Sequence, residues 1–228
     1  MELRLSRILA PSAGPDDWKR LLASADHWRT GYSARSLAHS WHDAAGDFPS
    51  EIRSLLDTSP LFTSAELLLA VPEHKVPLPG VGKASQTDLW FLGRTESALV
   101  SCAVEGKVAE PFGPTIEDWL AEGGDNRAKR LTGLCQLLGI ESVDSRVRYQ
   151  LIHRTASAIL EAKRFLARHA LLIVHSFSQA DDWYDDFATF AQSLGAVPAK
   201  GRLVQVPGRT EPTLHIGWAR GAARFAEA

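Results

Sequence analysis

The sequence predicts an α/β domain in which a mixed β-sheet is flanked by helices, with an N-terminal helical subdomain before it. Three observations lead to this fold class: a helical first third, two strand-like runs between residues 87 and 108, and a long amphipathic helix that leads into a short apolar run. We place the helical subdomain at residues 1–58 and the sheet domain at residues 59–228. With 228 residues, 45% of them hydrophobic, the chain can bury a substantial core.

The first third of the chain has apolar residues at helical spacing. The predicted helices are Pro15–His27, Ser33–Asp43 and Ser50–Leu56, the last of which follows Pro49. We therefore expect a helical layer before the sheet begins.

The next segment predicts a fourth helix and then a turn. Thr63-Ser-Ala-Glu66 has the spacing of a capping box, so an apolar helix is expected over Leu67–Val71, ending at Pro72. Residues 75–82 are rich in proline and glycine, which suits a short edge strand and a turn.

Two strand-like runs, Thr87–Leu92 and Ala98–Val108, are predicted to form an antiparallel hairpin with the four-residue loop Gly93–Glu96. In the second run every other residue from Ala98 onward is apolar or small, which indicates a core-facing side.

The opposite face of this hairpin carries charged residues. Side chains alternate along a strand, so Glu105 and Lys107 share one face, and a loop of even length places Asp88 on that face too. Two nearby carboxylates need a cation between them, and oxygen ligands of this kind select Mg²⁺ or Mn²⁺. A lysine beside them would act on water or on charge that builds up at a phosphate, which indicates phosphodiester hydrolysis.

A structural interpretation of the same three residues stays open at this point. Glu-x-Lys on an exposed strand is also a common ion pair, and an aspartate near the start of a strand is often part of a turn. On that interpretation, Glu105 and Lys107 would form a solvated strand face.

The rest of the chain returns to alternating helices and strands. An irregular helical region, Thr115–Gly139, precedes a long amphipathic helix over Arg146–Arg168. That helix leads directly into Ala170–Val174, a continuous apolar run that predicts a strand buried on both faces.

This order of elements resembles the αβββαβ core of the PD-(D/E)XK nuclease superfamily, which has the restriction endonuclease-like fold. The stretches VEGKVAEPFG, RYQLIHRTASA and LLIVHSFS are similar to an uncharacterised bacterial domain family placed in that superfamily. The resemblance covers roughly residues 60–220, and the helices before residue 58 lie outside the nuclease core.

The resemblance assigns roles to the charged hairpin residues. Asp88 matches the acid of the second core strand, and Glu105 with Lys107 matches the (D/E)XK pair. Asp88 and Glu105 are then the ligands of Mg²⁺ or Mn²⁺, and Lys107 positions or activates the attacking water. Thr87 departs from the family pattern, because proline usually precedes this aspartate.

Further residues complete the site that the resemblance implies. Glu66 is the candidate for an assisting helical glutamate, although the capping box gives it another role, and Glu73 is its substitute. Gln150, Arg154 and Ser157 share one helical face, which can reach over the sheet edge that carries the acids. Gln150 matches a polar residue that orients the site; the alternative for this face is that it is solvated. Glu110 is either an acid just outside the metal ligands or a cap on the strand end.

The resemblance therefore implies a Mg²⁺-dependent nuclease, with DNA as its substrate rather than RNA. Two alternatives stay open: a non-catalytic binding or assembly module of the same fold, and a hydrolase of a small phosphorylated metabolite, which would need a closed pocket. The same fold would accommodate a homodimer or a protein partner.

Composition sets limits on these functions. The formal net charge of −2 is not that of a broadly basic nucleic-acid-binding surface, so contact with DNA must be local. The N-terminus is too short and too charged for a signal peptide and no apolar run approaches ~20 residues, so we expect a cytoplasmic protein without membrane contact. Cys102 and Cys135 lie in apolar segments and are expected to be buried reduced thiols.

Overall fold

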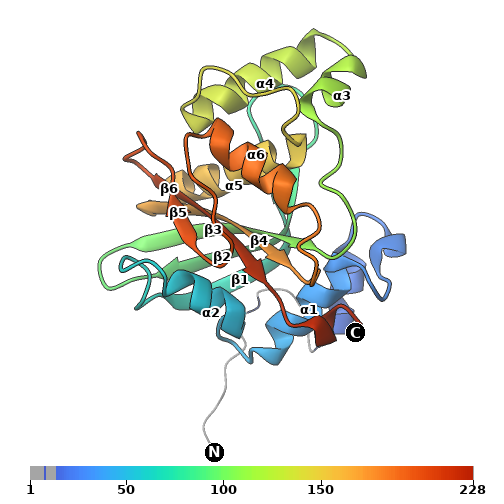
Figure 1. Ribbon diagram of the computed structural model, residues 1–228, viewed down its shortest axis with the longest axis vertical. Helices are drawn as coiled ribbons and strands as arrows, with labels where there is room; N and C mark the ends of the chain where they lie inside the picture. Colours follow the sequence, from blue (N-terminus) through green and yellow to red (C-terminus); the bar gives the residue numbers. More distant parts are fainter. Residues whose placement is uncertain (1–7, 9–13, 228) are drawn as a thin grey trace, which may run out of the picture.

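The computed structural model describes residue 8 and residues 14–227. These residues form one six-stranded mixed sheet with helices on both faces (Figure 1), which confirms the predicted fold class. The strands run in the order β1-β2-β3-β4-β6-β5 across the sheet. Their bounds are β1 Glu66–Val76, β2 Ser85–Arg94, β3 Leu99–Lys107, β4 His169–Ser176, β5 Leu203–Gln205 and β6 Thr213–Arg220.

The helices form two layers, one on each face of the sheet (Figure 1). On one face lie α1 (Ser33–Asp43) and α2 (Ser50–Leu56), together with the 3₁₀ helices η1 (Pro15–Leu21) and η2 (Ala25–His27). The other face is covered by α3 (Ile116–Ala121), α4 (Asp125–Leu138), α5 (Tyr149–Arg164) and α6 (Tyr184–Ser193). A last 3₁₀ helix, η3, spans Ala223–Phe225.

Strand directions divide the sheet into two parts. β1, β2 and β3 form an antiparallel meander, whereas β4 runs parallel to β3 and β6 runs parallel to β4. α5 makes the crossover between the parallel strands β3 and β4 and packs on both of them. Because the charged ends of β2 and β3 lie next to this helix, its side chains can reach them.

The core lies on both sides of the central strands. In β4, Leu171 and Ile173 pack in the core under α1 and α2, whereas Leu172 and Val174 pack under α5 and α6. The continuous apolar run predicted a strand buried on both faces, and this prediction is confirmed. α1 and α2 share a core with the sheet, while the division of the chain at residue 58 stays a prediction.

The predicted helix over Leu67–Val71 is wrong, because these residues lie in the edge strand β1. β1 pairs with β2 from Glu66 to Val76 and passes through Pro72, which an edge strand tolerates because one side of its backbone needs no partner. Backbone pairing with β2 along the whole of β1 stabilises a strand more than a capping box, which involves only one helical turn, can stabilise a helix. The edge strand predicted within residues 75–82 therefore begins earlier, and residues 77–84 form a loop.

The predicted hairpin is confirmed with a shift of its loop. Arg94 pairs with Leu99, so the loop has four residues as expected but spans residues 95–98. Leu89 pairs with Val104, which sets Asp88 opposite the next residue of β3, Glu105. The predicted shared face of these two acids follows from that register.

Several predicted helix bounds are corrected. Residues 15–27 form η1 and η2 instead of one helix, because Leu22 and Ser24 have extended backbone. The long helix spans only Tyr149–Arg164: the Tyr149 amide donates to the Pro114 carbonyl at 3.1 Å, and Leu166 adopts a positive φ of 55°. After β4 the chain forms α6, β5 and β6, and none of these elements was predicted from the sequence.

Two further expectations concern cysteines and membranes. Cys102 and Cys135 are both buried free thiols, as predicted. Within residues 14–227, no helix combines the length and the apolar character that crossing a bilayer requires.

A buried hydrogen bond links the meander to the crossover helix and can be tested. Ser101 Oγ accepts from Trp90 Nε1 at 2.9 Å and donates to the Ala158 carbonyl at 3.0 Å. Ser101→Ala leaves the buried indole N–H without a partner, so we expect the free energy of unfolding in urea to fall by about 1–3 kcal/mol. Ser97→Ala, in the exposed hairpin loop, should change it by less than about 0.5 kcal/mol. Equal losses in the two variants would contradict this assignment.

Candidate functional site

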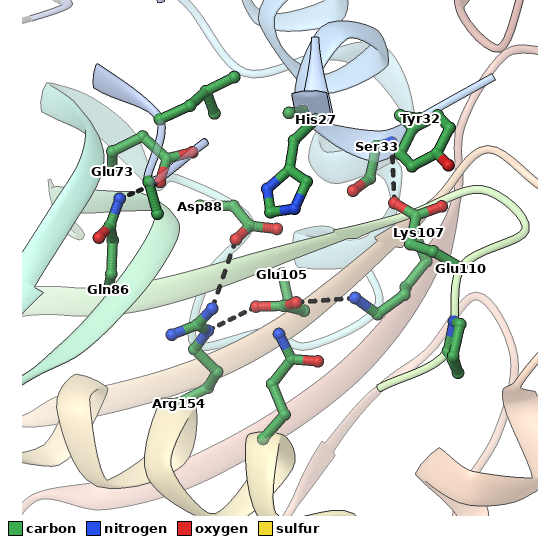
Figure 2. Close-up of a pocket in the computed structure, with 15 residues that line it drawn as sticks. His27, Tyr32, Ser33, Glu73, Gln86, Asp88, Glu105, Lys107, Glu110 and Arg154 are labelled. Carbon is green, nitrogen blue, oxygen red and sulfur yellow. Dashed lines mark hydrogen bonds and ion pairs between the residues drawn. The ribbon is translucent and has the colours of Figure 1, made fainter. Parts of the chain in front are cut away.

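The charged residues of the hairpin open onto a cavity of about 350 Å³ (Figure 2). The sheet and α5 form its floor, and the segment from η1 to α1 contributes the opposite wall. The polar residues that line it are His27, Tyr32, Ser33, Glu73, Gln86, Asp88, Glu105, Lys107, Glu110, Gln150 and Arg154.

Asp88, Glu105 and Lys107 come together in this cavity. Lys107 Nζ lies 2.8 Å from Glu105 Oε1, and the two side chains are 4% and 1% exposed. Asp88 lines the same cavity from the neighbouring strand and is 18% exposed. The trio is thus a largely buried cluster, and the solvated strand face considered above is excluded for Glu105 and Lys107.

Arg154, from α5, lies between the two carboxylates. Its Nε donates to Glu105 Oε2 at 2.5 Å, and its Nη2 lies 3.5 Å from Asp88 Oδ1. Figure 2 shows this guanidinium bridging the acids from the helix side. The helical spacing of Gln150 and Arg154 predicted that both can reach over the acids, but the ion pairs of Arg154 with Asp88 and Glu105 were not predicted.

Gly106 allows Asp88 to approach the backbone of β3. The Gly106 amide donates to Asp88 Oδ2 at 2.9 Å. A Cβ added to Gly106 would lie 3.1 Å from Ser33 Cβ and 3.5 Å from Asp88 Oδ2. Glycine between Glu105 and Lys107 therefore keeps room for both the acid and the start of α1.

Glu66 and Glu73 differ sharply in position. Glu66 is 57% exposed and pairs with Arg94 at 2.8 Å, away from the cavity. Glu73 lines the cavity and accepts from Gln86 Nε2 at 2.7 Å, with a positive φ of 53°. Residues 66–71 form a strand instead of the predicted helix. Glu73, the substitute proposed for Glu66, is therefore the glutamate that lies in the cavity with the other acids.

The remaining predicted residues divide between the cavity wall and structural roles. Gln150 lines the cavity, one helical turn from Arg154. Glu110 also lines it, and its two oxygens accept from the amides of Ser33 at 2.8 Å and Val108 at 3.1 Å. Glu110 thus caps the end of β3 and ties it to the start of α1.

Burial and mutual repulsion shift the pKa values of the acids. Burial first and the charge of Glu105 second raise the pKa of Asp88 to about 7, and Arg154 offsets this only in part. Burial and the charge of Asp88 raise the pKa of Glu73 to about 8. For Glu105 burial acts in the same direction, but Arg154 and Lys107 outweigh it and lower the pKa. The cavity has four carboxyl side chains and only two cationic ones, so it lacks positive charge.

The donor set suits a hard cation that keeps water ligands. Among residues 14–227, no group of three or more His, Cys, Asp or Glu side chains could hold a metal ion by itself. Mg²⁺ is often held by only one or two carboxylates, with water and phosphate oxygens completing the shell. Asp88 and Glu105 fit that pattern, and the repulsion between their charges adds to burial in raising the pKa of Asp88.

Comparison with known proteins gives a family without an assigned activity. Residues 11–223 match the model of the family described as "Domain of unknown function (DUF6946)", and the chain belongs to this family. The match includes α1 and α2 as well as the whole sheet. No curated protein and no solved structure matches the chain.

The raised pKa values predict a pH dependence of stability. An acid with a folded-state pKa of about 7, against 3.8 in the unfolded chain, stabilises the folded state fully below pH 3.8 and loses this contribution as the pH rises through 7. The wild type should therefore lose about 1–3 kcal/mol of unfolding free energy relative to Asp88→Asn between pH 5 and pH 9. Urea denaturation of both proteins at each pH measures this difference, and the buried histidines contribute equally to both. A difference independent of pH would show that Asp88 titrates as an ordinary surface acid.

Proposed function

We propose that this member of the DUF6946 family is a Mg²⁺-dependent phosphodiester hydrolase that acts on DNA and has a PD-(D/E)XK nuclease-like core. The observation that carries the proposal is the convergence of Asp88, Glu105 and Lys107 in one cavity, where the side chains of Glu105 and Lys107 are buried. Two acids and a lysine on adjacent strands suit metal-assisted attack on a phosphate.

The strand order supports the proposed core. The antiparallel β1–β2–β3 meander, the crossover through α5 and the parallel strand β4 follow the succession that the resemblance implies. The acids come from β2 and β3, as in the superfamily pattern. One fold can carry many different functions, so the support for this activity comes from the residues of the cavity.

Asp88 and Glu105 are the residues that would hold Mg²⁺. When bound, the ion would polarise the phosphate and lower the pKa of a water molecule. Arg154 pairs with the same two carboxylates. When an ion binds, the guanidinium would have to share the carboxylates with it or withdraw toward Ser85, whose Oγ lies 3.2 Å from Arg154 Nη1.

Lys107 would act on the phosphate. Its ammonium group has three N–H donors, one of which bonds to Glu105, and Nζ lies 4.8 Å from the centre of the Phe112 ring. A donor free to face the cavity would orient a water molecule or stabilise the negative charge that develops on the phosphate oxygens.

Glu73 would supply a proton in this reaction. With a pKa of about 8, its carboxyl group is mostly protonated at neutral pH, in the same cavity as the ionised Glu105. Acids whose environments push their pKa values apart can divide the roles of general acid and charged ligand. Glu73 would then donate a proton to the leaving oxygen.

A second candidate, hydrolysis of a small phosphorylated metabolite, is favoured by the shape of the cavity. Leu22, Ala23, His27 and Tyr32, from the N-terminal segment, line the wall opposite the sheet. A cavity of about 350 Å³ is in the range of small-molecule sites, so the same residues would serve this reaction.

Arg154→Ala tests whether the acids form a cation site. Without the guanidinium, two buried carboxylates lack their partner, so we expect the variant to lose about 3–5 kcal/mol of unfolding free energy. Added Mg²⁺ should then raise its melting temperature more than it raises that of the wild type, because the ion replaces the missing charge. Calorimetry measures both shifts, and the double variant Arg154→Ala with Glu105→Gln should lose the response. If Mg²⁺ leaves Arg154→Ala unaffected, the metal assignment is wrong.

Cleavage assays test the activity itself. With Mg²⁺ or Mn²⁺ and linear, nicked, branched and single-stranded DNA, we expect Asp88→Asn and Lys107→Ala each to reduce the rate at least ~100-fold while remaining folded. Glu96→Gln, in the exposed hairpin loop, is the control and should keep the wild-type rate. Turnover of small phosphate esters but not of DNA would favour the metabolite hydrolase. Inactivity on every substrate would favour a non-catalytic binding module.

A further inference from the structure

A second cavity, of about 490 Å³, lies beside the acidic one and has the opposite charge. It is bounded by α3, α4, the start of α5 and the loop between β1 and β2, in the upper part of Figure 1. Among the described residues that line it none is acidic, whereas Lys83, Arg127 and Arg130 are basic and Trp119, Tyr149 and His153 carry rings.

Arg130 is a buried cation without a counter-charge. It is 5% exposed, and among the described residues it forms no ion pair with a carboxylate. Its guanidinium donates only to neutral oxygens: the Tyr149 hydroxyl at 2.9 Å, the Val81 carbonyl at 3.3 Å and the Lys83 carbonyl. A buried charge is costly unless it is paired, so this site is suited to an anion.

The loop between β1 and β2 is built around this arginine. Gly80 and Gly82 have positive φ values of 80° and 142°. A Cβ added to Gly80 would lie 3.3 Å from Arg130 Cα, and one added to Gly82 would clash with the guanidinium. Glycine at both positions lets the loop carbonyls reach Arg130 and fixes its position at the cavity wall.

Two aromatic rings form another wall. Trp119 and Tyr149 stack with their centroids 3.9 Å apart and their planes 9° apart, and the Arg127 guanidinium lies 5.3 Å from the Trp119 ring centre. Because these rings stack on each other, each covers one face of its neighbour, and a planar ligand would pack against the sides of the pair that remain open to the cavity. Aromatic rings beside arginines are surfaces against which nucleic-acid bases pack. The cavity therefore offers an anion site beside an aromatic wall.

The basic cavity adjoins the acidic one through Ser85. Ser85 Oγ lies 2.8 Å from His153 Nδ1, in the basic cavity, and 3.2 Å from Arg154 Nη1, in the acidic one. Burial, with Arg154 and Arg130 nearby, holds the pKa of His153 well below its usual value. His153 is thus uncharged. Arg127 pairs with Glu122 at 3.0 Å, so the positive charge that has no acidic partner among the described residues comes from Lys83 and Arg130.

We infer that the basic cavity binds one nucleotide, with its phosphate at Arg130 and Lys83 and its base against Trp119 and Tyr149. If the acidic cavity hydrolyses DNA, this nucleotide would be next to the bond that is cleaved, and that assignment rests on the proposed function. The same chemistry is offered by a free nucleotide and by a nucleotide unit within a single strand. A metal ion is not a suitable ligand, because no described acid lines the cavity.

Binding measured in EDTA tests this inference without cleavage. Calorimetric titrations with dTMP, thymidine and inorganic phosphate, and anisotropy of a 5′-fluorescein-labelled octamer of thymidylate, give the affinities. We expect dTMP to bind at least about tenfold more tightly than either thymidine or phosphate, because only dTMP uses both the rings and the cations.

Variants locate the binding site. Trp119→Leu should weaken dTMP binding at least about fivefold, since it removes a ring against which the base packs. Lys83→Ala removes an exposed cation, which leaves the fold unaffected, and should also weaken binding and reduce its salt dependence. Lys129→Ala is the matched control, because Lys129 is exposed on α4 but does not line the cavity.

The outcomes separate this inference from the proposed function. If the octamer binds more tightly than dTMP and Trp119→Leu weakens both, the ligand is a strand; if only dTMP binds, it is a free nucleotide. Both results support the nucleotide site, even if cleavage assays with Mg²⁺ find no activity. If dTMP binds no more tightly than phosphate, or if Lys129→Ala weakens binding as much as Lys83→Ala, the inference is overturned, and cleavage in the acidic cavity is unaffected by that result.

Discussion

The bridge that Arg154 forms between Asp88 and Glu105 is the interaction on which the rest of the site depends. Two carboxylates buried on adjacent strands repel each other, and removing them from water is costly unless a cation pairs with both. α5 supplies that cation because its crossover from β3 to β4 lays it across β2 and β3. The pairing lowers the pKa of Glu105, whereas the pKa of Asp88 stays raised at about 7. One guanidinium and one lysine therefore do not fully compensate the negative charge of the two carboxylates.

The two cavities are electrostatically complementary. The acidic one has more carboxyl groups than cations, whereas the basic one holds a buried arginine that pairs only with neutral oxygens. On the proposals above, a phosphate-bearing ligand would occupy the second cavity and a hard cation the first. Ser85 contacts residues of both, His153 in the basic cavity and Arg154 in the acidic one.

The N-terminal helices belong to the site as well as to the core. Glu110 joins the start of α1 to the end of β3 through the amides of Ser33 and Val108, and Gly106 leaves room for Ser33. The segment from η1 to α1 therefore closes one side of the acidic cavity. The family match includes this region, which agrees with its packing against the sheet.

Local periodicity in the sequence was enough to predict several features of the site. Alternation along a strand places Glu105 and Lys107 on one face, and an even loop adds Asp88, because these relations need only neighbouring residues. The tertiary structure alone decided that Glu73 and not Glu66 enters the cavity, since pairing with β2 made a strand of a segment that has a helix-start signal. It also decided the role of Arg154, because the reach of a long side chain depends on how α5 packs across the sheet, which no local pattern specifies.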